Sequence, residues 1–474
     1  MNRVLSAVMF APRGGSAHAA RTLARHLPAH GWAPTILSGS RGDLSPDGDA
    51  WSFYAGLDVH AVDFTAALRD PDPFHPADRR VAPMHPSYED RPGAPDRVFA
   101  SLDDLDLERQ VRTWGLALRE ACAAQADVLH VHHLTPINEA AQRLLPWTPI
   151  VGHLHGTELL MLEAIDAGPP SDWPFAERWA ERMRAWARRC FSLLVAPGAV
   201  ERAATLLELD RSRLVEVPNG IEIDRFERLE VDRADHWEDH LVREPRGWRA
   251  GGAPGSVRYE ASDLEALRNG TVLIYVGRFT EVKRLGLLIR AFARAQERLR
   301  QPAALVLVGG HPGEWEGEHP LEAIEASGAR DVFLAGWHEQ DRLAGFLSAS
   351  DVILLPSARE QFGQALIEGM ACGLPAIAAE SYGASRIVAD EESGWLVPAD
   401  DRDALAAAIV DAVNRPAERG RRGERARRAV VERYGGERMA ARVAAAFHAA
   451  RGRRALPMPA ERRLEPNVQV VTNE

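Results

Sequence analysis

The chain has 474 residues, of which 46% are hydrophobic and 26% are charged. This length and composition predict a globular protein with two or three domains, each with its own core, and exclude a disordered chain. The net charge of −11 argues against a general nucleic-acid-binding protein, which needs a basic face to displace counterions.

The first apolar run, residues 4–11, is short for a signal peptide and has no clean cleavage site, so it predicts a first β-strand. No apolar run approaches the ~20 residues of a transmembrane segment. The three cysteines, Cys122, Cys190 and Cys372, have neither disulfide-type nor metal-type spacing. This cysteine usage indicates a reducing, cytoplasmic location.

Short apolar runs alternate with longer segments of helical periodicity, which predicts parallel sheets with crossover helices. Thirteen such runs are too many for one ordinary sheet, so we expect an α/β fold of two doubly wound, Rossmann-like domains facing across a cleft. The predicted strands are residues 4–12, 34–39, 57–63, 127–133, 150–155, 191–197, 213–218, 271–277, 303–310, 331–336, 351–356, 375–380 and 394–399.

We expect a first domain over residues 1–226 and a second over 269–436. Between them, residues 227–268 predict a linker or insertion of low order, because 235–263 is charged and rich in Gly and Pro; a short helix within it is an open alternative. An irregular stretch over 70–95 suggests a loop over the cleft. Further on, residues 404–413 and 418–434 predict helices, the second with an Arg-rich solvated face, and residues 451–474 predict a disordered tail.

A glycine turn, Gly14 and Gly15, follows the first predicted strand and opens a helix with Ser16 as a candidate N-cap. Glycines allow a sharp turn and close approach of the backbone to a ligand. The turn lacks the G-x-G-x-x-G dinucleotide fingerprint, so both a ligand loop and a plain tight turn remain open.

Two cations, Arg278 and Lys283, follow the strand predicted over 271–277 and stand near the start of a helix. Cations at the carboxyl end of a strand beside a helix N-terminus suit a diphosphate. The alternative is a basic pair on the surface.

Five histidines end two neighbouring predicted strands. His130 with His132, and His153 with His155, are i, i+2 pairs that share a face, so a zinc site is one alternative. We expect no metal, because no nearby carboxylate or cysteine has ligand spacing. His155, in the sequence HGTE, is expected to point at the cleft, and the other histidines, including His133, to be structural.

Trp179, Met183, Trp186 and Cys190 recur at 4-3-4 spacing. This stripe is typical of the core-facing side of a helix rather than of a membrane surface.

Two glutamates eight positions apart, Glu360 and Glu368, lie on the loop after strand 351–357 and in the helix that follows. Phe362 and Gly363 place backbone N–H groups at that helix's N-terminus, which attracts anions. Carboxylates accept paired hydrogen bonds from vicinal hydroxyls, so the segment suits a ligand with both phosphate and sugar hydroxyls. The alternative is that both glutamates are ordinary solvated acids at a helix start.

Together these segments resemble the retaining GT-B glycosyltransferases of family 4, also called glycosyl transferases group 1. The resemblance follows the family's order and covers nearly the whole chain; its specific part is the Glu-x7-Glu segment with GRFxxxK. The matching stretches are the turn at 14–15, HGTE at 155–158, VPNGIEIDRF at 217–226, VGRFTEVKRL at 276–285, VGG at 308–310, DVFLAGWH at 331–338 and the glutamate segment at 360–368.

The resemblance implies that Arg278 and Lys283 bind the donor diphosphate, that Glu368 binds the ribose hydroxyls and that Glu360 contacts the transferred sugar. It places His155 near the reacting face of the sugar and assigns catalytic roles to His155, Glu360, Arg278 and Lys283. Further donor-binding positions are Gly14 and Gly15 at the cleft, Gly309, Phe362, Gly363 and Gln364 through their backbone, and Trp337 and His338 beside the nucleotide base.

The family resemblance also implies that catalysis needs no metal and no cofactor, since the nucleotide sugar is a co-substrate, and that a helix over 437–450 crosses back to the first domain. This chain departs from its relatives at Gln364, where many have a small apolar residue, at Gly369, where they have Ala, and at Arg386, which replaces an acid. These departures leave the donor sugar open.

The predicted function is transfer of a hexose-type sugar from a UDP-, GDP- or ADP-linked donor to an acceptor hydroxyl, with retained configuration. The acceptor, a small molecule, glycan or lipid, and the oligomeric state stay undefined. Alternatives are another GT-B enzyme, such as an epimerase-like one, or a non-catalytic nucleotide-sugar-binding partner subunit. A phosphorylase would need a pyridoxal lysine context and a much longer chain.

Overall fold

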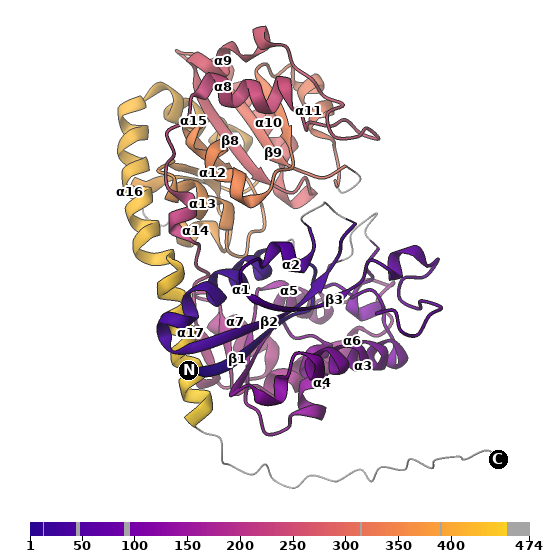
Figure 1. Cartoon of the computed structure of the whole chain (residues 1–474). Helices are drawn as coiled ribbons and strands as arrows, with labels where there is room; N and C mark the ends of the chain where they lie inside the picture. The colour runs from indigo at the N-terminus through magenta and orange to yellow at the C-terminus, as the bar shows by residue number, and fades with distance from the viewer. Residues whose placement is uncertain (13, 44–47, 90–94, 313–314, 389–390, 453–474) are drawn as a thin grey trace, which may run out of the picture.

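The computed structural model describes residues 1–12, 14–43, 48–89, 95–312, 315–388 and 391–452. The chain forms two lobes, each built on a parallel sheet (Figure 1). The first sheet has the strand order β3-β2-β1-β4-β5-β6-β7 and the second has the order β10-β9-β8-β11-β12-β13. The predicted architecture of two doubly wound parallel sheets is confirmed. The predicted tail lies, from residue 453 on, outside the described residues.

All thirteen predicted strands are present, each within four residues of its predicted ends. The strands of the first sheet are β1 (Asn2–Val8), β2 (Trp32–Ser40), β3 (Asp58–Asp63), β4 (Val128–His132), β5 (Ile150–His153), β6 (Ser192–Val195) and β7 (Leu214–Glu216). Those of the second are β8 (Thr271–Gly277), β9 (Ala303–Gly309), β10 (Val332–Gly336), β11 (Val352–Leu355), β12 (Ala376–Ala379) and β13 (Gly394–Val397).

Helices connect the strands of both sheets. The first lobe contains α1 (Gly15–His26), α2 (Ala50–Phe53), α3 (Asp104–Glu120), α4 (Pro136–Leu144), α5 (Thr157–Asp166), α6 (Ala176–Arg189) and α7 (Val200–Leu207). The rest of the described chain contains α8 (Arg233–Glu238), α9 (Glu265–Asn269), α10 (Leu285–Gln296), α11 (Pro320–Ser327), α12 (Gln340–Ser348), α13 (Gln364–Ala371), α14 (Ala384–Ile387), α15 (Arg402–Asn414), α16 (Pro416–Tyr434) and α17 (Gly436–Gly452).

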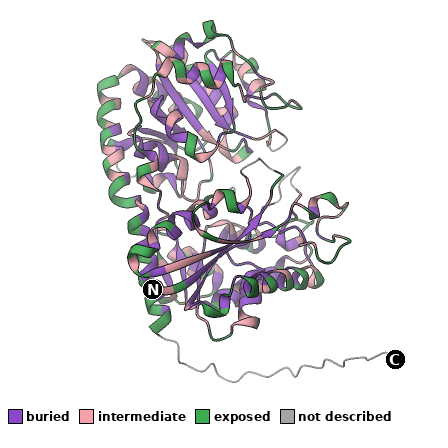
Figure 2. Cartoon of the chain, viewed as in Figure 1, coloured by how far each residue is buried: buried purple, intermediate pink, exposed green. Residues whose placement is uncertain are grey.

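Both faces of each sheet are buried, and the exposed surface lies on the outer helices and loops (Figure 2). In β1, Val4 and Leu5 belong to hydrophobic clusters on opposite faces of the first sheet. Helices on both faces explain why the strands read as continuous apolar runs rather than as an alternating pattern. The stripe of Trp179, Met183 and Trp186 is at most 2% exposed, so the predicted core-facing side of α6 is confirmed.

The segment predicted to have low order is folded. Residues 233–243 form α8 and a following π-helical turn, and a 3₁₀ turn, Ala261–Leu264, leads into α9. Trp237, Leu241 and Trp248 are at most 1% exposed. The charged, Gly- and Pro-rich composition indicated disorder, but these apolar side chains anchor the segment on the second sheet.

The last two helices run along one side of the molecule, α16 beside the second lobe and α17 beside the first (Figure 1). Met439, Val443 and Phe447 of α17 share a hydrophobic cluster with Val4 and Trp32 of the first lobe. The chain therefore ends its described part on the domain in which it began. None of the helices in the described ranges has the length and apolarity to cross a bilayer.

Candidate functional site

The middle of the second sheet positions most of the predicted site. Strands β8 and β11 are neighbours, and the strand order runs outward from them in both directions. Parallel α/β sheets bind ligands beyond the carboxyl ends of strands at such a switch point. Arg278 and Lys283 follow β8, and Glu360 to Glu368 follow β11, so the sequence segments with the predicted donor-binding residues meet at one edge.

Lys283 and Glu360 form an ion pair at this edge. The Lys283 Nζ donates to Glu360 Oε2 over 2.5 Å, and the two side chains are 17% and 16% exposed. The other carboxylate oxygen, Oε1, accepts the Gly363 backbone N–H at 3.3 Å. The pair therefore joins the β8 loop to the start of α13.

Gly363 is the N-cap of α13 and has a φ of +84°, a conformation that favours glycine. Gln364 is the first residue of the helix, and Phe362 precedes the cap with its ring packed on Tyr434. The first turn of α13 thus presents backbone N–H groups at the carboxyl edge of β11, as predicted from the sequence. Whether these residues bind a donor stays a prediction.

Glu368 is buried, with 4% exposure, and it accepts hydrogen bonds at Oε1 from the side-chain amides of Gln340 (2.7 Å) and Gln364 (3.0 Å). Burial raises the pKa of Glu368 to about 7, although the two amide hydrogen bonds act in the opposite direction. Such a carboxylate is not a solvated acid at a helix start, so that alternative is excluded for Glu368.

Arg278 is the more exposed of the two predicted diphosphate-binding cations. Its side chain is 55% exposed and lies 3.9 Å from the Glu89 carboxylate, which belongs to the irregular stretch predicted as a loop over the cleft. An exposed pair at this distance contributes little to stability. Arg278 is therefore available for an anionic ligand.

The glycine turn of the first lobe faces this edge. Gly14 caps α1 and Gly15 is its first residue. A Cβ at Gly15 would lie 3.4 Å from the Gln364 side-chain oxygen, so the turn comes close to the start of α13. No side chain caps α1, and the predicted Ser16 N-cap is wrong: the cap is Gly14, two residues earlier, and Ser16 lies within the helix.

His155 lies just after β5, and Gly156 caps α5 with a φ of +95°. The His155 backbone N–H donates to Glu158 at 3.3 Å, and its ring Nε2 pairs with His132 Nδ1 at 2.9 Å. Burial lowers the pKa of His155 well below its usual value, so its ring is neutral at pH 7.

The other predicted structural histidines form a buried ladder. Ser6 Oγ lies 3.2 Å from His130 and 3.1 Å from His132, and His130 pairs with His153 at 3.3 Å. Ring nitrogens of His130, His132 and His153 all lie within 4.8 Å of one another, and this is the one group in the described residues that meets the geometry for a metal ion. His132 bonds to Ser6 and His155 rather than to the other two rings, so these polar rings are linked in one hydrogen-bonded network.

His133 has a separate partner that the sequence reasoning missed. Its φ is +66°, and its Nδ1 lies 2.6 Å from the carboxylate of Glu158, which is fully buried. Burial alone would raise the pKa of Glu158, but the contacts with His133 and two backbone N–H groups lower it below its ordinary value. The HGTE sequence pattern gave no sign of this pair, because Glu158 reads as an acid in the first turn of α5.

Three further predicted residues lie on the β9 and β10 side. Gly309 ends β9 with a φ of +118°, and a Cβ there would meet the Gly277 carbonyl oxygen at 2.1 Å, so only glycine fits. Trp337 is 38% exposed, whereas His338 is 5% exposed and bonds to the Ala335 carbonyl at 3.1 Å. Burial lowers the pKa of His338 to about 3. An open side chain for stacking on a base is thus present at Trp337 rather than at His338.

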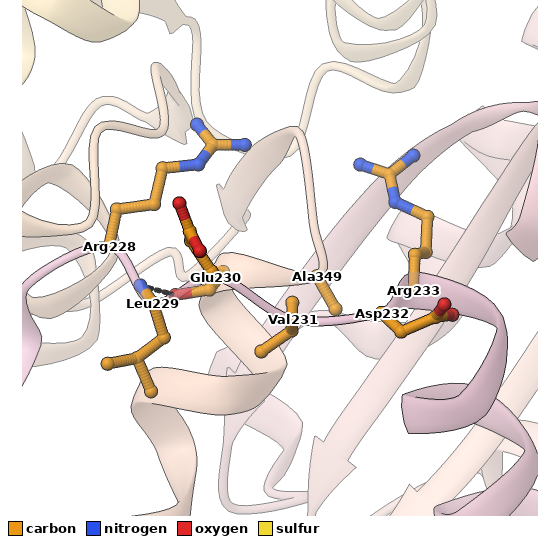
Figure 3. A pocket seen from close by; sticks show the side chains of 8 residues that line it. Arg228, Leu229, Glu230, Val231, Asp232, Arg233 and Ala349 are labelled. Atoms are coloured by element: carbon orange, nitrogen blue, oxygen red, sulfur yellow. Dashed lines mark hydrogen bonds between the residues drawn. The ribbon is translucent and has the colours of Figure 1, made fainter.

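A hollow of about 500 Å³ lies away from this site (Figure 3). It is lined by residues 228–233, Ser348 and Ala349, and the Leu229 backbone N–H donates to Ser348 Oγ at 2.9 Å. Arg233 also pairs with Asp351, just before β11, which places the hollow at the amino edge of the second sheet. Ligands of parallel sheets bind at the opposite edge.

The residues at the departures from the family pattern have structural roles. A Cβ at Gly369 would lie 2.8 Å from Ile353 of β11, so the close packing of α13 on the sheet explains the glycine. Arg386 stacks on Tyr382 at 4.1 Å and abuts Gly198 of the first lobe. Arg386 therefore serves the contact between the lobes.

The sequence was also compared with known proteins. Residues 13–225 match the family model described as Glycosyltransferase Family 4, and residues 261–429 match the one described as Glycosyl transferases group 1. A sucrose-phosphate synthase structure from Thermosynechococcus elongatus superposes with a TM-score of 0.63 at 19% identity, covering 94% of this chain and 99% of the other. The structure of Anabaena HepE with UDP and glucose gives 0.63 at 15% identity, covering 95% and 100%. The fold is therefore GT-B.

The chain belongs to the family-4 glycosyltransferases, as both family models and the curated relatives agree. D-inositol 3-phosphate glycosyltransferase 2 of Catenulispora acidiphila is 34% identical over 34% of this chain and 40% of its own length. N-acetyl-alpha-D-glucosaminyl L-malate synthase of Bacillus anthracis is 31% identical over 35% of this chain and 42% of its own length. The match thus spans about two fifths of the length of these relatives. A longer match is with D-inositol 3-phosphate glycosyltransferase of Thermomonospora curvata, which is 29% identical over 68% of this chain and 72% of its own length.

Proposed function

We propose that the protein is a retaining glycosyltransferase that moves a hexose-type sugar from a UDP-, GDP- or ADP-linked donor to an acceptor hydroxyl. One observation carries the proposal: the carboxyl edge of β8 and β11 gathers two cations, a helix N-terminus and two carboxylates. The cations and backbone N–H groups match a diphosphate, and the carboxylates match sugar and ribose hydroxyls. The proposed donor site lies between the lobes, mostly on the second. All three cysteines are free, which supports the predicted cytoplasmic location.

The proposed reaction is a same-face displacement. The bond between the anomeric carbon and the phosphate oxygen breaks, and its electron pair stays with the diphosphate. The acceptor oxygen bonds to the anomeric carbon from the same side, and its proton passes to the departing phosphate oxygen. Arg278, Lys283 and the first N–H groups of α13 stabilise the growing negative charge, and the cleft orients the reactants.

The side chains near the donor have separate parts in this proposal. Glu360, already bonded to Lys283 and to the Gly363 N–H, contacts hydroxyls of the transferred sugar. Glu368 accepts from the ribose, and neutral His155 lies on the first-lobe side of the sugar. Gly14 and Gly15 approach the phosphate or the acceptor. In this proposal Arg278, Lys283 and the α13 N–H groups balance the diphosphate charge, so no metal ion is required.

The test is binding followed by turnover. Thermal stabilisation by UDP-, GDP- and ADP-sugars identifies the donor, because a ligand of the native state raises its stability by mass action. UDP-glucose comes first, since HepE was solved with UDP and glucose. D-inositol 3-phosphate and L-malate are the first acceptors, because the names of relatives include them.

A product that keeps the donor's anomeric configuration, seen by NMR, supports the proposal. An inverted product contradicts the same-face mechanism. A chain that binds the donor and turns over none of a broad acceptor panel is instead a nucleotide-sugar-binding partner subunit. Release of a free epimerised sugar nucleotide would favour the epimerase-like alternative.

A further inference from the structure

A line of hydrogen bonds joins the first lobe to the predicted ribose carboxylate. The Arg21 guanidinium, on α1, donates to the side-chain oxygen of Gln340, the first residue of α12. The Gln340 side-chain nitrogen then donates to Glu368 Oε1 at 2.7 Å. A residue in the first helix of the chain therefore contacts, through one glutamine, a carboxylate on the opposite lobe.

Both ends of this line are buried, and Gln340 between them is half-buried. Arg21 is 6% exposed, lies 4.3 Å over the Phe53 ring and is 3.5 Å from the Glu222 carboxylate. Glu368 is 4% exposed. Buried polar groups with fixed partners hold one geometry, because a broken hydrogen bond there is not replaced by water.

Glutamine suits the middle position for a chemical reason. Arg21 offers only donors and an ionised Glu368 only acceptors, so the residue between them must accept on one side and donate on the other. This requirement also fixes which end of the Gln340 amide is oxygen. An acid at position 340 would meet Glu368 with a second negative charge, and an apolar residue would break both bonds.

The two amides that reach Glu368 use the same oxygen. Gln364 Nε2 donates to Oε1 at 3.0 Å, beside the Gln340 bond. Among the residues that the structure describes, none donates a hydrogen bond to Oε2. The carboxylate is thus anchored by one oxygen, with the other free to accept.

We propose that Gln340 is a positioning residue for Glu368: it anchors Oε1 so that Oε2 meets the donor ribose, and Arg21 of the first lobe fixes Gln340 in turn. The inference rests on the proposed function, because it takes Glu368 as the ribose ligand. Its consequence is that donor affinity depends on a first-lobe arginine that acts through Gln340. Donor binding and the contact between the lobes are thereby linked.

The test compares three variants with the parent chain: Gln340→Met, Arg21→Met and the double variant. Methionine keeps a chain of similar length and removes the hydrogen bonds. The matched control is Arg25→Met, one turn further along α1, whose guanidinium pairs with Glu222 rather than with Gln340. Calorimetry with UDP, GDP and ADP measures affinity for whichever nucleotide the parent binds, and melting curves verify folding.

Each single variant should weaken nucleotide binding roughly 3- to 30-fold, the range of indirect effects carried by a contact network. The double variant should lose no more nucleotide affinity than the weaker-binding single variant, because both substitutions break the same series of hydrogen bonds. Donor KM should rise while kcat at saturating donor stays near the parent value. Arg25→Met should bind as the parent does.

A pH profile distinguishes positioning from general loosening. The groups that face Glu368 are Gln340 on α12, Gln364 on α13, Arg21 on α1, Arg225 in the 3₁₀ turn Ile223–Phe226, and the Cys372 thiol after α13. Without the Gln340 bond the carboxyl holds its proton to higher pH. As the pH is lowered, nucleotide affinity should therefore begin to fall at a higher pH in Gln340→Met than in the parent or in Arg25→Met.

Several outcomes overturn the inference. If folded Gln340→Met has the nucleotide affinity and pH profile of the parent, the inference is wrong and the proposed function is unaffected. Tighter binding would also overturn the inference, because it means that the amide competes with the ribose. If the parent binds none of the three nucleotides, the proposed function itself fails, and the role of Gln340 with it. If Arg21→Met does not fold, Gln340→Met alone decides.

Discussion

At the scale of single residues, Lys283 carries the most weight in the proposed chemistry. Its side chain is 17% exposed and its ammonium pairs with Glu360, so its charge is fixed at the edge where the proposed diphosphate gains negative charge. Preorganised charges of this kind stabilise a transition state more than a bound substrate. The more exposed Arg278 supplies the second charge with less restraint.

Lys283→Ala and Arg278→Ala should each lower kcat, by about 10²–10³-fold for a lost preorganised partner. The larger loss is expected for Lys283→Ala, which also leaves Glu360 without its cation. The losses need not add, since both cations serve one leaving group. Steady-state kinetics with the identified donor measures the effect, and Arg290→Ala, whose guanidinium pairs with Glu318 on the outer surface, is the control. Parent-like turnover by both folded variants would refute the leaving-group assignment.

Removal of metal ions should leave most activity. The proposed diphosphate partners are Arg278, Lys283 and the α13 N–H groups, so a divalent cation is not needed to balance the charge. His130, His132 and His153 have the spacing for an ion, but His130 bonds to Ser6 and His153, and His132 bonds to Ser6 and His155. Activity after EDTA treatment, compared with activity after adding back Mg²⁺, Mn²⁺ or Zn²⁺, measures this. Loss of activity that one ion restores would contradict it.

Some residues of the candidate site could be placed from the sequence, and some of its contacts could not. Glu360, Gly363 and Glu368 were located correctly, because a strand, a loop and a helix start fix their mutual positions within one short segment. The Lys283–Glu360 ion pair, the His133–Glu158 pair and the Gln340 link could not be predicted. Each joins segments far apart in the chain, and their geometry follows from the folded lobes rather than from local pattern.

At the scale of elements, strands were predicted well because they are buried on both faces and bounded by loops. The order of the segment over 227–268 was underestimated for the complementary reason, although the short helix left open there is present as α8. Its composition is that of a linker, but Trp237, Leu241 and Trp248 fill space on the second sheet. A few large apolar side chains outweigh many charged ones when an existing core can receive them.

The packing of α13 on β11 leads to a prediction about Gly369. Replacing it with alanine should destabilise this chain by about 1–3 kcal/mol, because the new Cβ meets Ile353 and the core must shift. A Cβ at this position would lie 2.8 Å from the Ile353 Cβ. Urea unfolding measures the loss. Gly420→Ala in α16, where a Cβ has open space, should instead be neutral or stabilising. Equal stability of the two variants would contradict the packing argument.

At the scale of the whole molecule, the two lobes are joined in three ways. The 217–226 segment connects them directly, α17 returns to the first sheet, and side chains such as Arg21 and Arg386 reach across. The two-lobed fold could be predicted from the number of strands. The way the lobes meet could not, because single polar contacts set it.

Buried histidines predict how stability depends on pH. His18 and His153 have pKa values lowered to about 3 by burial, and burial lowers those of His130, His132 and His155 well below 6.5. These rings are neutral in the folded chain but take up protons below pH 6.5 when it unfolds. Because the unfolded state then binds more protons, stability should fall as pH drops from 6.5 towards 3.

Each such histidine contributes up to about 1.4 kcal/mol per pH unit in that window. Glu368 opposes the trend, since its pKa of about 7 exceeds the usual 4.5 and its proton is held more tightly in the folded state between those values. Glu368 offsets only part of the effect of these histidines, so a net loss of stability towards acid is expected. The free energy of unfolding in urea between pH 7.5 and 5 gives the number of protons taken up. His153→Gln should make the slope shallower by about one proton, and an unchanged slope would contradict this account of the buried ladder.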